Sequence, residues 1–378
     1  MSAQYRVWID GKPAVRAQYD RLETVVVEQG MGMATEARLE FEACIDDKGV
    51  WKNGPSDPVA RAWKRVRIEV RHGGGAWTPL IDGPIIAWNA SMSGEPGHSM
   101  LTVTVHDDGA LLNRKPAKMD IKWEGKSDAD IMRSLLQGYE VHIDDLPITP
   151  SDIPVQFMQN GSPMEILLTI AQRHGVDLYV KPGEREGWPS HVIVERRNPK
   201  KFPELPNLVL TGPKRNLDSF DARSDSLFGN QFKGSRLNLR DMAVVSHTTS
   251  WKDVSLLGDK SAIDDPEILG YDLLDPVDAA SYDHIERAEE AQQWISFQTT
   301  ASGTIRSGCY DGVLAPYETI LVVGVSSLST KYMISEVTHT LGRSSYEQSF
   351  TLIGNARVEL DENGFPVTNL PPATVQQR

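Results

Sequence analysis

The hydrophobic and polar positions between Val313 and Gly354 predict three antiparallel strands. Ile320–Val325 is a continuous apolar run rich in β-branched residues. Apolar and polar side chains alternate along Tyr346–Ile353, which is typical of a strand with one buried face. The segment holds no plausible catalytic constellation, and it resembles the wall of a small barrel.

The strand predicted between these two, Tyr332–Leu341, contains a break in its alternation. Tyr332 and Ile334 share one face, whereas Val337 and Leu341 fall on the other. One extra residue near Ser335–Glu336 would bring all four side chains to the same side, and a β-bulge supplies such a residue. We therefore expect a bulge there.

Residues 1–115 carry the same alternating pattern in several short segments separated by glycine-containing turns. The predicted strands are Tyr5–Ile9, Leu22–Glu28, Leu39–Ile45, Arg65–Arg71 and Leu101–His106. Several short strands with one dry face predict a small closed barrel or a sandwich. The glycines at 73–75 lack the Lys-Ser/Thr and the helix of a phosphate-binding loop, so we expect a hairpin tip.

One of these strands is strongly charged on its polar side. Arg65, Arg67, Glu69 and Arg71 alternate with three aliphatic residues. Charged residues on an antiparallel strand normally face water. The pattern therefore predicts that these four side chains are exposed to solvent.

Residues 116–204 change to a helical period and predict a small α/β domain. Ser127 is a candidate helix N-cap, and Ser162 with Glu165 forms a capping box that opens a second helix. Each helix ends near a glycine and is followed by a strand. His174, at the end of the second helix, is expected to act as a favourable cation at the helix C-terminus rather than as a metal ligand.

The rest of the chain returns to extended segments around one helix. We expect a proline-rich linker at 199–213, and a second barrel built from 205–253 and 302–356. Residues 254–301 read as an acidic loop followed by a helix capped by Asp283. Residues 357–378 contain three prolines and few large apolar side chains, so we expect an extended C-terminal tail. The fold class is thus mainly β with α+β: two tandem small antiparallel β-barrels, a small α/β domain and a helical insertion.

Composition and charge narrow the function. The 378 residues carry a net charge of −13, which argues against specific nucleic-acid binding, because phosphate contacts need clustered Lys and Arg. Two cysteines, Cys44 and Cys309, form no disulfide framework and fit synthesis in a reducing cytosol. No signal peptide or apolar run long enough to cross a membrane is seen, so we expect no stable membrane insertion. Most of the nine tryptophans are expected in cores.

No strong catalytic or metal-binding motif is present, and we expect no catalytic residue, no metal and no cofactor. Four aspartate pairs could in principle act as a glycosidase acid pair, but all follow predicted strand ends or lie in loops, where solvated acids are the norm. They are Asp46-Asp47, Asp107-Asp108, Asp144-Asp145 and Asp264-Asp265. Five histidines lack helical spacing and are expected in surface or capping positions: His72, His98, His106, His174 and His191. Cys309 lacks a nearby histidine and is expected to be buried or chemically idle.

The order of elements resembles the hub proteins of contractile phage tails. These are the late-control-protein-D-like and Mu-like baseplate hubs, which share a fold with the N-terminal part of type VI secretion spike proteins. The resemblance rests on Ile9–Gly11 with the later Leu101–Arg114, on Val155–Gly183, and on the helix Asp283–Thr300 followed by Leu314–Gly354. These stretches span nearly the whole chain, and the order and spacing of the motifs carry the similarity.

The resemblance implies a structural protein rather than an enzyme. It implies barrels similar to tail-tube subunits, and a homotrimer whose six barrels adapt a six-fold tube to a three-fold spike. The implied partners are the tail tube or a tube-initiator protein, a separate central spike protein and baseplate wedge proteins. The implied location is the baseplate of the virion tail, assembled as a late protein in the bacterial host cytoplasm.

Two alternatives stay open. One is the hub of a genome-free contractile injection particle or pyocin. The other is a glycan-binding or glycan-cleaving tail protein, which should expose aromatic side chains such as Trp77, Trp88 or Trp188 in a groove, or an acid pair in a cleft. We also expect the channel of a hub to be acidic, so that passing DNA is repelled, and the tail 358–378 to reach a neighbour or the spike.

Overall fold

The computed structural model describes residues 3–357, with gaps in the description at 53–56, 73–74, 96, 115–121, 138, 140, 144–145, 149–154, 159–160, 199–202, 226–230, 239–241, 259, 263–270, 274–283 and 307. The C-terminal tail, two aspartate pairs (144–145 and 264–265), the helix cap expected at Asp283 and part of the expected linker lie outside the described residues. The fold is mainly β, as the sequence pattern predicts. No helix of the described chain is long and apolar enough to cross a membrane.

The strands fall into four groups along the chain. The first group is β1 (Ala3–Ile9), β2 (Lys12–Pro13), β3 (Leu22–Gly30), β4 (Glu36–Glu42), β5 (Cys44–Ile45), β6 (Trp51–Lys52), β7 (Arg65–His72), β8 (Thr78–Ser91) and β9 (Met100–His106). The second is β10 (Lys122–Lys126), β11 (Val141–Ile143), β12 (Val155–Met158), β13 (Asp177–Lys181) and β14 (Ser190–Glu195). The third is β15 (Glu204–Val209), β16 (Leu217–Ser224), β21 (Thr299–Ile305), β22 (Thr319–Val323), β23 (Lys331–Gly342) and β24 (Tyr346–Gly354). The fourth is β17 (Gln231–Asn238), β18 (Ala243–Thr248), β19 (Lys260–Ser261), β20 (Tyr271–Leu273) and β25 (Ala356–Arg357).

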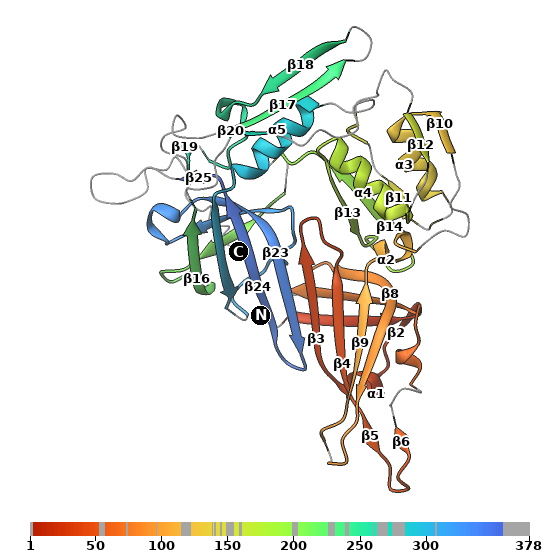
Figure 1. Cartoon of the computed structure of the whole chain (residues 1–378). Coiled ribbons are helices and arrows are strands. Elements are labelled where there is room, and N and C mark those ends of the chain that lie inside the picture. The colour runs from red at the N-terminus through yellow and green to blue at the C-terminus, as the bar shows by residue number, and fades with distance from the viewer. Residues whose placement is uncertain are drawn as a thin grey trace.

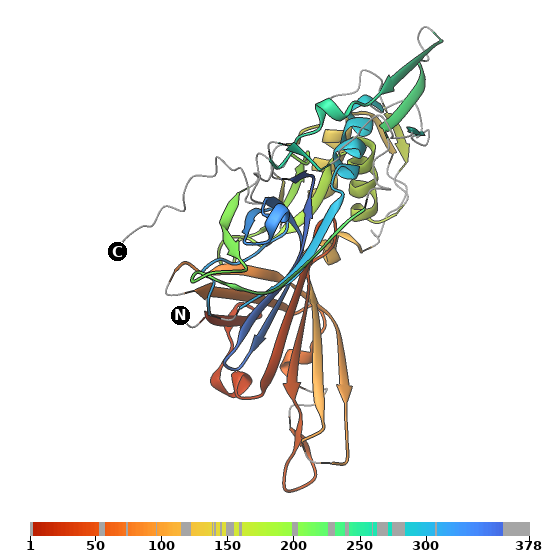
Figure 2. The same cartoon turned by 90° about the vertical axis from the view of Figure 1, so that its left-hand side faces the viewer.

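Five α-helices join these strands. They are α1 (Arg16–Tyr19), α2 (Gly109–Leu112), α3 (Asp128–Leu136), α4 (Pro163–Arg173) and α5 (His284–Ile295). Short 3-10 turns lie at Pro58–Ala60, Trp251–Asp253 and Ser326–Leu328. Figures 1 and 2 show the α/β domain and α5 gathered at one end of the long strands, with the β5–β6 hairpin at the opposite end.

The two barrels expected from the sequence share one continuous sheet. Strand β23 pairs with β3, and eight strands follow one another in the order β16-β21-β24-β23-β3-β4-β9-β8 (Figure 1). Every neighbouring pair in this order is antiparallel. The chain therefore forms two curled half-barrels fused side by side.

The two halves of this sheet repeat one topology. In chain order the first half consists of β3, β4, β8 and β9, and the second consists of β16, β21, β23 and β24. In both halves the third, fourth, second and first strands lie next to one another in space, in that order. Each third strand also pairs with the strand before it in the chain, β7 with β8 and β22 with β23. The halves differ in the second layer, because β1 pairs with β7 antiparallel whereas β15 pairs with β22 parallel.

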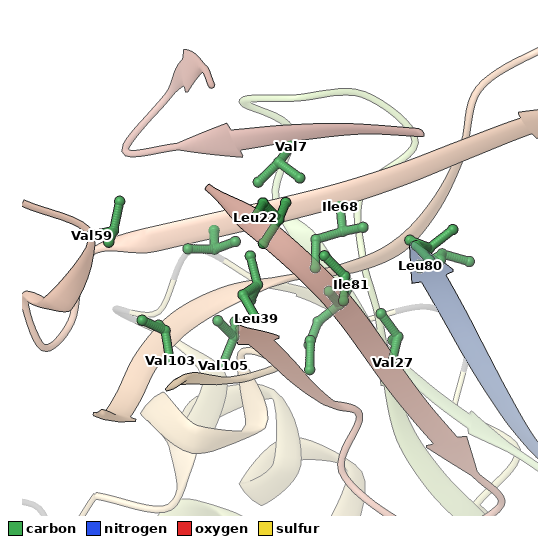
Figure 3. Packing of buried hydrophobic residues seen from close by; sticks show 14 of the residues in the cluster. Val7, Leu22, Val27, Leu39, Val59, Ile68, Leu80, Ile81, Val103 and Val105 are labelled. Carbon is green, nitrogen blue, oxygen red and sulfur yellow. The ribbon is translucent and has the colours of Figure 1, made fainter. Parts of the chain in front are cut away.

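Two apolar cores lie behind the shared sheet, one for each half. The first joins side chains of β1, β7 and β8 to those of β3, β4 and β9, as Figure 3 shows for Val7 and Ile68 on one side and Leu39 and Val105 on the other. The second includes Leu208, Ile320, Tyr332, Val337 and Phe350 among its members. Because strand residues alternate between faces, burial of one face leaves the other free for a different role.

The bulge predicted near Ser335–Glu336 is confirmed. The pairing of β23 with β24 shifts register between Ile334 and Glu336. As a result Ile334 and Val337 both join the second core. The extra residue at the bulge is Ser335, and its hydroxyl donates a hydrogen bond to the carbonyl of Thr351 at 3.0 Å.

The α/β domain forms as its caps predict. The Ser127 side chain accepts from the Asp130 backbone N–H at the start of α3, and Ser162 with Glu165 forms the predicted capping box of α4. Both helices contribute to one apolar core with β13 and β14. His174 is the C-cap of α4, as predicted, although it is buried rather than solvated.

The prediction that residues 231–251 pair with the strands of the second barrel is wrong. Strands β17 and β18 do not join the second barrel; they pair with each other and with β20, and α5 packs against them. The second half of the sheet closes instead through β21, which pairs with both β16 and β24. Alternation identified these segments as strands but carried no information about which strand each one pairs with.

Candidate assembly surfaces

The face of the shared sheet opposite the cores is polar across seven strands. One row of paired Cα positions runs unbroken across the seven strands: Ser219, Thr304, Ser349, Thr338, Glu28, Glu36 and His106. The neighbouring rows add Asp221, Ser302, Thr351, Glu336, Glu347, Thr340, Val26, Arg38, Thr104, Thr24, Glu40 and Thr102. We call these residues the polar sheet face.

The polar sheet face carries a net negative charge. It has six carboxylates, from Glu28, Glu36, Glu40, Asp221, Glu336 and Glu347, against the guanidinium of Arg38, and it holds no aromatic residue apart from His106. Arg223, at the margin on the same side of β16, adds one more cation and leaves the balance negative. Serine and threonine fill most of the other positions. A hydroxyl-rich and acidic surface of this kind would weakly repel a polyanion. It is not flat, since Ser219, Asp221, Glu336 and their neighbours line a hollow of about 510 Å³ on it.

Glu36, on the polar sheet face, is held by two neighbouring side chains. Its carboxylate lies 2.9 Å from His106 Nε2 and 2.7 Å from the Arg38 guanidinium. Partial burial tends to raise the pKa of Glu36, but the hydrogen bonds from His106 and Arg38 outweigh it and hold the pKa below the ordinary value. Glu36 is therefore ionised at neutral pH.

Both ends of the eight-stranded sheet are open edges. Strand β8 changes partner midway, pairing with β7 through Thr78–Pro84 and with β9 through Ile85–Ser91. At the other end β16 pairs only with β21. Ile85 still exchanges backbone hydrogen bonds with Trp63 and Lys64 on its outer side. In the described chain no second strand covers the outer side of Ala87–Ser91 or of β16, and such edges are ready templates for strand pairing with another chain.

For two of the four charged side chains of β7, Arg67 and Glu69, the prediction of solvent exposure is wrong. Arg67 is 2% exposed and Glu69 1% exposed. The Arg67 guanidinium donates to Glu69 at 2.8 Å and to Asp82 at 2.9 Å, and Arg6 of β1 also pairs with Glu69. Alternation showed that these residues share a face, but it could not show that other parts of the chain cover that face.

The aspartate pair Asp107-Asp108 is likewise buried, and the prediction that it is a solvated turn is wrong. Asp108 accepts two hydrogen bonds from Arg65, at 2.9 and 2.7 Å, and one from the hydroxyl of Ser190 at 2.6 Å. Asp107 accepts from the backbone N–H groups of Thr35 and Gly109. Burial raises the pKa of Asp107 to about 6, although the two backbone N–H groups oppose the rise.

These buried charges tie the first half-barrel to the α/β domain. A chain of ion pairs runs through Arg67, Asp82, Arg65 and Asp108. It ends on Ser190 at the start of β14. The network therefore connects β7 and β8 to β14, and every acid in it has a cationic or hydroxyl partner.

Tyr317 forms a second junction, where three parts of the chain meet. Its ring stacks on Tyr179 of β13 with centroids 4.1 Å apart, and its hydroxyl accepts from the Gly32 N–H at 2.9 Å. Its own N–H donates to the carbonyl of Ile334 in β23. Tyr317 has a φ of 66°, a left-handed conformation that is strained for a non-glycine residue and persists only where its surroundings hold it.

The histidines do not gather into a site. His106 pairs with Glu36, His174 with Asp128 at 2.7 Å, and His98 is exposed near Glu95. His191 stacks loosely on His142, and His72 lies against Tyr346. Among the described residues no group of three or more His, Cys, Asp or Glu side chains is placed to hold a metal ion. Both cysteines are exposed, so Cys309 is not buried, and the expectation of a chemically idle thiol stays a prediction.

The tryptophans are the side chains whose surroundings differ most from expectation. None of the eight whose surroundings are described is buried, and Trp63, Trp88, Trp188 and Trp294 are exposed by 43–49%. Trp77 lies between Arg6 and Arg71 as a cation–π sandwich. Trp77, Trp88 and Trp188 do not converge on one groove. An aromatic-lined pocket of about 830 Å³ is formed instead by Phe232, Trp294 and Phe297 between α5 and β21.

Comparison with known proteins agrees with this architecture. No protein-family model matches the sequence, and no curated sequence matches it either. Among solved structures, the 43 kDa tail protein of prophage MuSo2 from Shewanella oneidensis matches with a TM-score of 0.63 at 14% identity, covering 93% of this chain and 98% of that one. A tail protein from Neisseria meningitidis MC58 matches with a TM-score of 0.61 at 13% identity, covering 94% and 97%.

A third match extends the similarity to secretion machines. An Escherichia coli component of the type VI secretion system, whose structure is described as similar to the bacteriophage T4 tail proteins gp27 and gp5, matches with a TM-score of 0.53 at 12% identity. The match covers 98% of this chain and 80% of that one. The resemblance drawn from the sequence is thus confirmed at the level of the fold: the chain has the fold shared by these phage tail proteins and the type VI secretion component.

Proposed function

We propose that this protein is a structural hub of a contractile phage tail, a homotrimer that joins a six-fold tail tube to a three-fold spike. The observation that carries the proposal is the repeated four-strand unit within one continuous sheet. Similarity to tail proteins over nearly the full length of both chains supports it. A structural role also accounts for a surface made of strand faces and open edges.

The internal repeat would solve a symmetry problem. A closed ring needs matching symmetry at each face, so a three-fold spike and a six-fold tube cannot share one simple ring. With two similar units per chain, a trimer would present six units to the tube on one side and three chains to the spike on the other. Three copies of the eight-stranded sheet would form one barrel of 24 strands.

The polar sheet face is the surface that would line the channel of this ring. The apolar cores, with the strands of the second layer, lie on the opposite side of the sheet. The excess of carboxylates over cations would keep DNA phosphates from binding to the wall. Such a lining would give the acidic channel that the net charge leads us to expect.

The partners follow from the same arrangement. The tube or tube initiator would stack on one end of the ring, a separate spike protein would bind the other, and baseplate wedge proteins would contact the outside. The ring would belong to the tail baseplate, assembled in the host cytoplasm. A genome-free injection particle would use the same hub, and only the presence of DNA in purified particles separates the two.

The direct test of the assembly is the mass of the purified protein in solution. Light scattering should give about 126 kDa, three times the chain mass of 42.0 kDa. A protein that stays monomeric at tens of micromolar, or forms a dimer, would contradict the hub. The glycan-cleaving alternative predicts instead that the monomer releases reducing sugar from bacterial surface glycans, and the hub predicts no release.

A further inference from the structure

The outer half of β8 carries only part of the protection that exposed strand edges normally have, namely a shift of register between Ile85 and Ala87. Residues 85–91, IIAWNAS, contain no charged residue and no proline. Natural proteins blunt free edges with Lys, Glu, Pro or bulges, because an uncharged edge pairs with other chains. Ala87, Trp88, Asn89 and Ser91 are nevertheless all exposed in the single chain. This edge has the composition of a strand that is covered in the working assembly.

Trp88 sits on this edge with its side chain toward the core side of the sheet. It pairs in register with Val103, which is 1% exposed, and Ala90 pairs with Leu101, which is fully buried. Trp88 itself is 43% exposed, because no strand of the described chain lies beyond β8 at this position. A core-side tryptophan left half in water marks an interface that a single copy does not complete.

The opposite end of the sheet presents a matching surface. On the core side of β16, Phe220 and Ala222 pair with Gly303 and Ala301, and both are only half-buried. Phe220 packs edge-to-face on Tyr332 with ring centroids 6.2 Å apart, so its position is fixed from within. The β16 edge therefore offers a small, pre-formed apolar shelf on the same side of the sheet as Trp88.

Strand direction makes the two ends compatible. The order from β8 to β16 contains eight strands that are all antiparallel to their neighbours, so β8 and β16 run in opposite directions. If copies related by rotation are placed side by side in a ring, β8 of one therefore lies antiparallel to β16 of the next, with both core sides facing outward. On the polar side, Ala87 and Asn89 would meet Ser219, Asp221 and Arg223, which places no like charges together.

We propose that Trp88 of one copy packs on Phe220 and Ala222 of the next copy, and that this contact anchors the joint between chains. The partner is a second copy of this chain, and the inference rests on the ring put forward as the function. It adds the two edges that meet and the side chain that carries most of the binding. Interface energy concentrates in few residues, and tryptophan is the commonest of them.

Substitution of Trp88 tests the anchor against a matched tryptophan elsewhere. Trp88→Ala should raise the protein concentration at which half of the chains are assembled by at least about tenfold, as expected for an interface hot spot. Trp188→Ala removes a side chain of nearly the same exposure, 49%, from the α/β domain, away from this edge. It should assemble like the wild type. Sedimentation velocity over a dilution series gives the readout, and the melting temperature of the monomer shows that each variant folds.

Cysteine trapping tests the geometry independently of affinity. In a Cys44→Ser/Cys309→Ser background, Ala90→Cys combined with either Ala222→Cys or Phe220→Cys should give a covalent trimer on a non-reducing gel, because all three positions lie on the core side. Ala87→Cys combined with Ala222→Cys places the thiols on opposite faces and should stay uncrosslinked. Each single cysteine variant should also stay monomeric on the gel.

The outcomes separate the two proposals. A wild-type trimer that tolerates Trp88→Ala and is not trapped by either core-side pair overturns the anchor and leaves the hub standing. A wild type that never assembles overturns both. Loss of assembly in Trp88→Ala alone, together with trapping of a core-side pair, supports the anchor and the edge pairing.

Discussion

His339 is a residue whose buried position makes stability depend on pH. It is fully buried at the seam between β23 and β3, with Nδ1 2.8 Å from the Tyr346 hydroxyl and Nε2 3.3 Å from the Gln29 amide oxygen. Burial lowers the pKa of His339 to about 3, although a backbone hydrogen bond with Leu314 opposes the shift. The folded state therefore holds this histidine neutral where the unfolded chain would bind a proton.

The sign of the pH effect follows. Between pH 6.5 and 3 the unfolded state binds the proton and the folded state does not, so stability is lost as pH falls below about 6.5. We expect this group to contribute a loss of up to about 1.4 kcal/mol per pH unit in that window. Urea unfolding at a series of pH values should show a shallower slope in His339→Gln, whereas His98→Gln, at an exposed position, should keep the wild-type slope. An unchanged slope in His339→Gln would show that other groups dominate.

Arg67 provides a second residue-scale prediction. Its guanidinium is shared by Glu69 and Asp82, and all three side chains are at most 2% exposed. Arg67→Met would leave two buried carboxylates short of a partner, and removing one member of a buried ion pair costs about 3–5 kcal/mol. Arg71→Met, on the same strand but bonded to Gln4 at the surface, should cost less than about 1 kcal/mol. Equal costs for the two variants would contradict a special role for the buried network.

The bulge in β23 matters at the scale of the element. Side chains in a strand have a period of two, so removal of one residue moves every later side chain to the opposite face. Deletion of Ser335 would turn Val337, His339 and Leu341 toward the polar sheet face, and we expect loss of cooperative unfolding. Ser335→Ala keeps the residue count and removes only one hydrogen bond, so it should cost about 1 kcal/mol. Thermal unfolding followed by circular dichroism distinguishes the two; a deletion variant as stable as Ser335→Ala would show that the register can adapt.

Elements could be predicted from the sequence to the extent that their signals are local. Alternation located the core strands, and the side-chain caps at Ser127 and Ser162 placed the starts of α3 and α4 correctly. The pairing of β3 with β23 joins residues some 300 positions apart, and no local pattern reports it. For the same reason β17 and β18 were placed in the wrong sheet.

The candidate surfaces were less predictable than the fold. The burial of Arg67, Asp107 and Asp108 depends on segments distant in the sequence that pack around them, and a sequence shows which residues are charged but not which of them are covered. The polar sheet face could have been suspected from Ser and Thr alternating with carboxylates on several strands, yet its continuity needs the cross-strand register. One feature of the sequence pointed to the edge at Trp88: a strand segment without charge or proline. The pattern of a single strand does not show, however, whether that strand lies at the edge of a sheet.

At the scale of the whole molecule, the acidic channel makes a prediction about DNA. Replacing Glu28, Glu336 and Glu347 by lysine would reverse the charge of the polar sheet face, and we expect the assembled variant to bind linear double-stranded DNA at low salt, with affinity falling steeply as salt is added. The wild type should not bind. Lysine at Asp47, Glu95 and Glu184 makes the same charge change at exposed positions elsewhere. Gel shifts that are equal for the two triple variants would show that the polar sheet face has no special access to DNA.

The arrangement of chains in the assembled particle tests the central claim most directly. An electron cryo-microscopy reconstruction of the purified assembly should show three copies around one channel, a continuous barrel of 24 strands, and the polar sheet face turned inward. A channel lined mainly by Lys and Arg, a copy number other than three, or a ring with the polar sheet face on its outside would contradict the account.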